Sequence, residues 1–250
     1  MLQISLIPQP QFSTSIKAVV TTGFFVFLLL STPAIIYAGE YVLMKGRGVE
    51  VCEIYKKNLN SFGHIMACER KINPKFADLK KPIWKKLDLW ENRELLRRAE
   101  KFLEFGSQHV ESGTMYDNTA EFEAYVKKSI PYNLNALYTT KIDINNDKKV
   151  EIILRYKRGR CLRTRHFGIP ILVLDNTGQS IDEKRSKPLL QNRFRTENQA
   201  GRWSYNLYDI FRYKKKMYFD KWDYDARVIL YVFQLKNNRS KMICKYKYKQ

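Results

Sequence analysis

The sequence predicts an α+β protein in which N-terminal helices pack on a C-terminal, mainly antiparallel β-sheet or sandwich. Up to about residue 130 the apolar residues recur at helical spacing, and beyond Pro131 they alternate with a period of two. The chain has 250 residues, of which 44% are hydrophobic, enough for one sizeable core. We therefore expect residues 39–130 to form a helical region and residues 131–250 a β region, together making one compact domain.

The N-terminal segment predicts export. Residues 18–39 carry no charged side chain, and Lys17 precedes them. A basic residue, an apolar stretch and a small residue at the cleavage position are typical of a secretory signal, so residues 1–38 are interpreted as a signal peptide cut after Ala38. The alternative is a single-pass membrane anchor through residues 18–39, which is long enough to cross a bilayer. Either interpretation predicts an exported protein, and cleavage makes it periplasmic or secreted.

Three helices are expected in the helical region. Apolar residues at helical spacing predict a helix over residues 49–61, with Cys52 on its buried stripe. Capping boxes that start at Asp88 and Asn118 predict two further helices. Two prolines within residues 72–87 predict an extended connection between the first helix and the second.

Strands are expected wherever apolar and polar residues alternate after Pro131. Asn237 and Asn238 predict the turn between the last two strands. In the last strand lysines alternate with inward-facing residues, a pattern typical of either a guarded edge strand or a basic binding surface. The expected strands cover residues 134–140, 150–156, 169–174, 205–212, 216–219, 228–235 and 241–248.

All four cysteines, Cys52, Cys68, Cys161 and Cys244, lie in the exported part of the chain. An even number of cysteines in an exported protein predicts two disulfides. Three pairings are open. We favour Cys52 with Cys68, which closes a short loop in the helical region, and Cys161 with Cys244, which ties the last strand to the middle of the β region. A zinc site is disfavoured because no CxxC pair occurs.

One motif carries metal-binding chemistry. Asp143, Asn145, Asp147 and Glu151 stand at positions 1, 3, 5 and 9 of a loop between two expected strands. Oxygen ligands at this spacing can converge on Ca²⁺, and the carbonyl of Lys149 can supply another. The alternative is an ordinary hairpin turn rich in Asn and Asp.

The segment 137–155 resembles the calcium loop of FG-GAP and VCBS-type repeats. The resemblance implies a structural Ca²⁺ held by the same four side chains, with Glu151 in the place of the closing Asp. The segment departs from the pattern at Lys148, where those loops prefer glycine. The whole chain also resembles small exported proteobacterial proteins of unknown function, a resemblance carried by the segments KKPIWKKLDLWEN, DINNDKKVEIILRY and YDIFRYKKKMYFDKW. That resemblance implies no catalytic residues.

The charge of the chain is strongly positive, with 45 Lys and Arg against 25 Asp and Glu and a formal net charge of +20. Export argues against nucleic acid as the partner and favours anionic lipids or other acidic envelope components. A dense basic cluster around Cys161 predicts an anion-binding site, because Arg binds carboxylate and phosphate bidentately. The cluster consists of Arg155, Lys157, Arg158, Arg160, Arg163 and Arg165.

Catalysis has little support in the sequence. No GxSxG, HExxH or phosphate-binding glycine loop occurs. Asp220 and Asp223 belong to an acidic cluster, and His166 follows the basic one, so the alternative function is an envelope enzyme that acts on an acidic polymer or glycan. We expect the acidic cluster to be solvated turn residues and the protein to be a non-catalytic binding or structural module.

Overall fold

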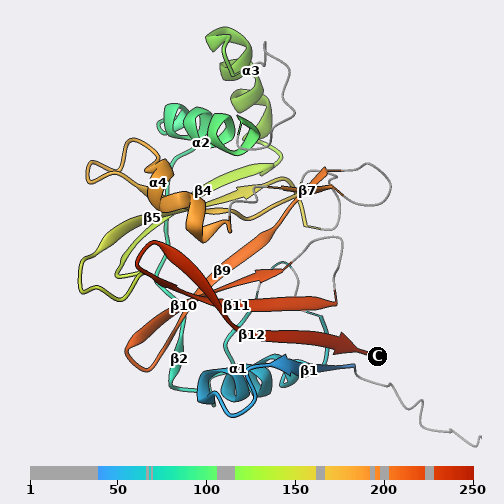
Figure 1. Ribbon diagram of the computed structural model, residues 1–250. Coiled ribbons are helices and arrows are strands. Elements are labelled where there is room, and N and C mark those ends of the chain that lie inside the picture. The colour runs from blue at the N-terminus through green and yellow to red at the C-terminus, as the bar shows by residue number, and fades with distance from the viewer. Residues whose placement is uncertain are drawn as a thin grey trace, which may run out of the picture. The chain divides into compact units, whose positions relative to one another are not determined.

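Helices and strands alternate along the chain instead of separating into an N-terminal and a C-terminal region. Figure 1 shows a computed structural model, which describes residues 39–65, 68, 70–105, 116–161, 167–191, 195–197, 203–222 and 228–250. Strand β1 (Glu40–Lys45) precedes the first helix, and helix α4 (Glu183–Leu189) follows six of the strands. The predicted α+β class is confirmed, but the prediction that the helices are N-terminal is wrong. Strand β1 was not predicted because only two of its side chains, Tyr41 and Leu43, are buried, and so short an alternation is not recognisable in the sequence.

Among the described residues, six antiparallel strands form a curled sheet in the order β1, β12, β11, β10, β9, β2. Strand β12 (Arg239–Lys249) lies between β1 and β11 (Ile229–Lys236), so the interpretation of its lysines as guards of an edge strand is wrong. Asn237 and Asn238 have φ angles of 50° and 54° and make the tight turn that their sequence predicts. The remaining strands are β10 (Lys216–Trp222), β9 (Leu207–Tyr213) and β2 (Leu79–Lys80).

A second antiparallel sheet has the order β3, β4, β5, β6. A parallel bridge between Ile169 and Leu207 joins it to the first sheet, and the amide of Tyr208 donates to the carbonyl of Ile169 at 2.9 Å. Two short strands, β7 (Arg195–Glu197) and β8 (Trp203–Tyr205), pair separately. The strands of the second sheet are β3 (Lys85–Lys86), β4 (Asn135–Ile142), β5 (Glu151–Arg158) and β6 (Ile171–Leu174).

Each helix packs against a particular strand or helix (Figure 1). Helix α1 (Glu50–Asn60) lies on β1 and β12, α2 (Arg93–Phe105) contacts α3 (Thr119–Ser129), and α4 lies on β6. Helix α3 begins as predicted, because the side chain of Asn118 accepts hydrogen bonds from two amides of the first turn at 3.1 and 3.2 Å. Helix α2 begins later than predicted, after a turn over residues 89–92 that the side chain of Asp88 caps.

Two hydrophobic cores lie on the two faces of the six-stranded sheet. Successive side chains of a strand point to opposite faces, so Phe219 of β10 packs in one core, while Tyr218 and Trp222 pack in the other. The first core includes α2 and the four-stranded sheet, and the second includes α1. The second core is strongly aromatic, since Tyr55 of α1 stacks on Phe211 with ring centroids 4.3 Å apart.

Two disulfides join distant parts of the chain. They pair Cys52 with Cys244 and Cys68 with Cys161, with Cα–Cα distances of 5.7 and 6.0 Å. The prediction of two disulfides is confirmed, but the favoured pairing is wrong. Cys52 lies on the buried face of α1, which packs on β12, so Cys244 is its spatial neighbour although 192 residues separate the two. Contact between elements, rather than closeness in sequence, decides the pairing.

The disulfides bear on the compartment of the protein. Such bonds form and persist in oxidising environments outside the cytoplasm. Residues 1–38, which carry the predicted signal peptide or anchor, lie outside the described residues. In the part of the chain that the structure describes, no helix is long and apolar enough to cross a membrane.

Candidate anion-binding site

The segment 70–87, the strap, lies between α1 and α2 and pairs with both sheets. Its strand β2 pairs with β9 of the six-stranded sheet, and its strand β3 pairs with β4 of the four-stranded sheet. Proline at positions 74 and 82 excludes helix at these points, which leaves the rest of the strap as turns and irregular backbone. The side chains of the strap therefore lie where the two sheets meet.

Arg70, at the start of the strap, is buried with Asp220 of β10. Its guanidinium donates to both carboxylate oxygens of Asp220 at 2.6 and 2.7 Å, and the hydroxyl of Tyr55 donates to the same carboxylate at 2.5 Å. Burial raises the pKa of Asp220 above its ordinary value, and the charge of Arg70 opposes that shift. Asp220 is 0% exposed, so the expectation of a solvated turn residue is wrong, and a polymeric substrate has no access to it.

Lys81 of the strap forms a second ion pair, with Asp209 of β9. Asp209 lies directly opposite Asp220 in the β9–β10 register. Burial by itself raises the pKa of Asp209, but the charges of Lys81 and then Arg70 outweigh burial, so the pKa is lowered. Two carboxylates that would otherwise repel each other are thus each paired with a cation of the strap, which fixes the strap on the sheet.

A pocket of 300 Å³ lies beside the second disulfide. Arg155 and Lys157 line it from one face of β5, because alternate residues of a strand share a face. In the sheet register Lys86, Tyr138 and Arg155 are direct neighbours on β3, β4 and β5, so basic and aromatic side chains form a row there. The other lining residues are Cys68, Tyr138, Cys161, Phe167 and Ile169.

Arg155 is held by aromatic rings rather than by carboxylates. Its guanidinium carbon lies 4.6 Å from the ring centroid of Trp84 and 4.8 Å from that of Tyr138. Stacking covers the faces of the guanidinium and leaves the N–H donors in its plane for a ligand. Among the described residues, the side chains of Arg155 and Lys157 form no ion pair and no hydrogen bond. This pocket therefore offers donors and positive charge to an anion.

The structure divides the remaining basic residues of the predicted cluster. Arg158 points to the opposite face of β5, where it pairs with the fully buried Glu100 of α2 at 3.4 Å. Arg160 is exposed and donates to the carbonyl of Tyr132 at 2.7 Å. Basic residues that are close in sequence therefore do not all line the same pocket, because successive side chains of a strand point to opposite faces of the sheet. The predicted residues Arg163 and Arg165, with His166 and Asp223, lie outside the described residues.

The predicted calcium loop, residues 143–151, closes on its own backbone amides. The carboxylate of Asp143 accepts hydrogen bonds from the amides of Asp147 and Lys148 at 2.9 and 2.8 Å. The carboxylate of Asp147 in turn accepts from the amide of Lys149 at 2.8 Å. Lys148 adopts a φ of 71° at the position where the calcium loops prefer glycine.

Glu151 closes the same loop from β5. It accepts hydrogen bonds from the amide of Ile144 at 3.1 Å and from the side chain of Asn145 at 3.3 Å, and burial raises its pKa. Among the described residues, no three His, Cys, Asp or Glu side chains are grouped so that they could hold a metal ion. These contacts favour the turn interpretation, and calcium binding stays a prediction.

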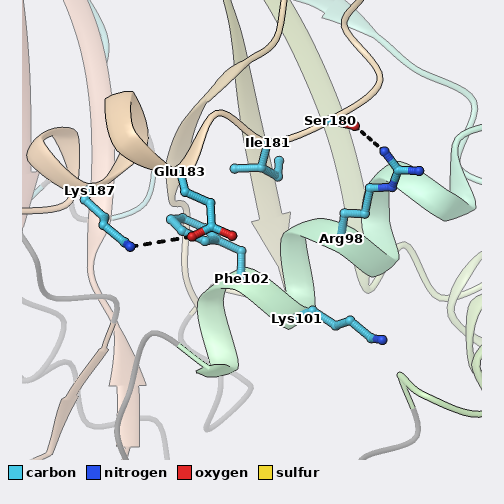
Figure 2. A pocket seen from close by; sticks show the side chains of 7 residues that line it. All are labelled: Arg98, Lys101, Phe102, Ser180, Ile181, Glu183 and Lys187. Carbon is cyan, nitrogen blue, oxygen red and sulfur yellow. Dashed lines mark hydrogen bonds and ion pairs between the residues drawn. The ribbon is translucent and has the colours of Figure 1, made fainter.

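A second pocket, of 380 Å³, lies between α2 and the segment that leads into α4 (Figure 2). Its walls are also basic, but each cation has a partner. The pairs are Arg98 with Ser180, Lys187 with Glu183 at 3.5 Å and Lys101 with Asp117 at 2.6 Å. Figure 2 shows Arg98 directed at Ser180 and Lys187 at Glu183. Because Glu183 lines this pocket and carboxylates already pair with Lys101 and Lys187, the pocket beside the second disulfide is the better candidate for an anion.

The cations of this site were predicted from the sequence, but the aromatic residues that contact Arg155 were not. Trp84 stands between two pairs of lysines in KKPIWKK, which signals an aromatic side chain on a basic surface. The alternation of apolar and polar residues around Tyr138 predicts a strand, but it does not indicate which side of the sheet the tyrosine faces.

Comparisons of the chain with protein-family models, with curated proteins and with solved structures find no match. Its class is therefore described by the fold and the site alone. The protein is an α+β, disulfide-linked domain with a basic pocket lined by aromatic side chains.

Proposed function

We propose that this protein is an exported, non-catalytic binding module that holds anionic components of the cell envelope in the pocket beside the Cys68–Cys161 disulfide. The observation that carries the proposal is the pair Arg155 and Lys157, which share the pocket and form no ion pair among the described residues, although the charge of Arg155 also acts on Asp209. Phosphate and carboxylate groups are the ligands that an edge-on guanidinium binds best. The net charge of +20 adds long-range attraction to anionic surfaces.

Export is part of the proposal, and the two disulfides support it. We expect the protein recovered from its host to have lost residues 1–38 and to carry no free thiol. Its intact mass, measured without reduction after treatment with an alkylating reagent, reports both properties at once. A mass that includes residues 1–38 would support the membrane anchor instead.

Titration with soluble inorganic polyphosphate tests the pocket. The variant R155Q/K157Q should bind at least about tenfold more weakly, because it removes two charged contacts. The matched control K247Q/K249Q removes the same charge from exposed lysines of β12 and should change the affinity by less than about twofold. Equal weakening in the two variants would mean that polyphosphate is held by general charge, which would contradict the proposal. Thermal unfolding of both variants verifies that they fold.

A further inference from the structure

We propose that the anionic partner is a phospholipid membrane surface and that Ile83 of the strap inserts into it. This inference rests on the proposed function, since it assigns the lipid headgroup to the pocket of Arg155 and Lys157. It adds a contact that anion binding alone does not need. The contact is an apolar side chain held at the surface beside the pocket.

Ile83 is 92% exposed, more than any other large hydrophobic residue among those that the structure describes. An isoleucine side chain has a higher free energy in water than in the apolar zone of a bilayer, so its transfer into the bilayer is favourable. It follows Pro82 and precedes Trp84, an aromatic residue of the kind that favours the membrane interface.

The charges around Ile83 suit an anionic lipid surface. Lys80, Lys85 and Lys86 of the same strap are exposed. Lys81 alone is turned inward, where it pairs with Asp209. An exposed apolar residue within a basic segment is the arrangement with which peripheral proteins combine insertion and electrostatic attraction.

The fold holds Ile83 next to Trp84, whose ring contacts the pocket residue Arg155. Strands β2 and β3 anchor the strap on each side of Ile83, with β2 on β9 and β3 on β4. The ring of the next residue, Trp84, lies under the guanidinium of Arg155, and Lys86 is the cross-strand neighbour of Tyr138. A lipid whose phosphate enters the pocket would therefore lie near the inserted side chain. An acidic polymer would use the same cations but would gain nothing from Ile83.

Sedimentation with vesicles of phosphatidylglycerol and phosphatidylcholine, beside titration with soluble polyphosphate, separates the two partners. We expect I83S to lower the affinity for these vesicles by about tenfold and to leave polyphosphate binding unchanged. The matched control V150S replaces an exposed apolar residue of another loop, 65% exposed, and should change neither affinity.

The outcomes distinguish this inference from the proposed function. If I83S binds vesicles as tightly as the wild type while R155Q/K157Q binds both probes weakly, the pocket holds an acidic polymer or a free anion and the membrane inference is overturned. If R155Q/K157Q binds both probes as tightly as its charge-matched control, the proposed function itself fails.

Discussion

The strap and strand β5 each place a pair of cations in the interior or at its margin, and of the two pairs only that of the strap forms ion pairs with carboxylates among the described residues. Arg70 and Lys81 of the strap meet carboxylates of β9 and β10, so their charge fixes the strap on the six-stranded sheet. Arg155 of β5 contacts aromatic rings and shares a pocket with Lys157, and neither cation forms an ion pair among the described residues. The position of the acidic partner, rather than the density of basic residues, therefore decides which cations stabilise the fold and which are left for a ligand.

The largest effect is expected from removal of the neutralised pair. In R70M the carboxylate of Asp220 stays buried without its cation, so we expect the free energy of unfolding to fall by about 3–5 kcal/mol in urea denaturation. The double variant R70M/D220N also removes the negative charge of Asp220 and should recover part of the lost free energy of unfolding. If the free energy of unfolding of R70M falls by less than about 1 kcal/mol, the Arg70–Asp220 pair does not stabilise the fold, which would contradict the distinction between the two pairs of cations.

The second disulfide connects the strap with β5, because Cys68 lies just before the strap and Cys161 lies just after β5. The variant C68S/C161S opens a bridge across 93 residues and should lower the free energy of unfolding by about 2–4 kcal/mol. We also expect weaker polyphosphate binding, since both cysteines line the pocket. The control C52S/C244S should lose stability but keep the affinity of the folded protein. Unchanged affinity in C68S/C161S would show that the bridge does not shape the site.

The ion pair of Lys81 should depend on pH in a defined direction. The pKa of Asp209 is lowered in the folded protein, so its stabilisation is complete above the unfolded pKa of about 3.9 and is lost as the pH falls through the lowered value. We expect D209N to cost about 1–3 kcal/mol near neutral pH and the difference from the wild type to shrink below about pH 4. Urea denaturation over this pH range measures it, and a constant difference would contradict the assigned pairing.

The smallest effect is expected at the loop 143–151, whose carboxylates already accept hydrogen bonds from the loop's own amides. Calcium should raise the midpoint of thermal unfolding by less than about 2 °C relative to a chelator, because little is left for the ion to organise. A larger rise at millimolar calcium would restore the calcium interpretation, and D143N should then abolish it.

Local patterns predicted most of the elements, and long-range pairing decided what the patterns could not. Helical spacing located α1, and Asn118 located the start of α3. The alternation in residues 241–248 correctly put Cys244, Tyr246 and Tyr248 on one buried face of β12. It was wrong for Met242, which packs against the other core beyond an irregularity in the β11–β12 register, and it gave no sign that β1 pairs with β12. The same limitation explains the disulfide error, since packing of α1 on β12 brings Cys52 to Cys244.

The site was predictable only in part for a related reason. The sequence contains the basic residues that line the pocket, but neighbours in sequence such as Lys157 and Arg158 face opposite sides of β5. Asp220 lies beside other acidic residues in the sequence, yet its burial depends on Arg70, which is 150 residues away. Which charges are neutralised is a property of the assembled sheets.

The most direct test of the account is a crystal structure of the protein with polyphosphate bound. We expect a phosphate group in the pocket beside Cys68–Cys161, held by the in-plane N–H donors of Arg155 and by the ammonium group of Lys157. Polyphosphate bound only on other basic surfaces, with this pocket unoccupied at a concentration that saturates binding in solution, would contradict it.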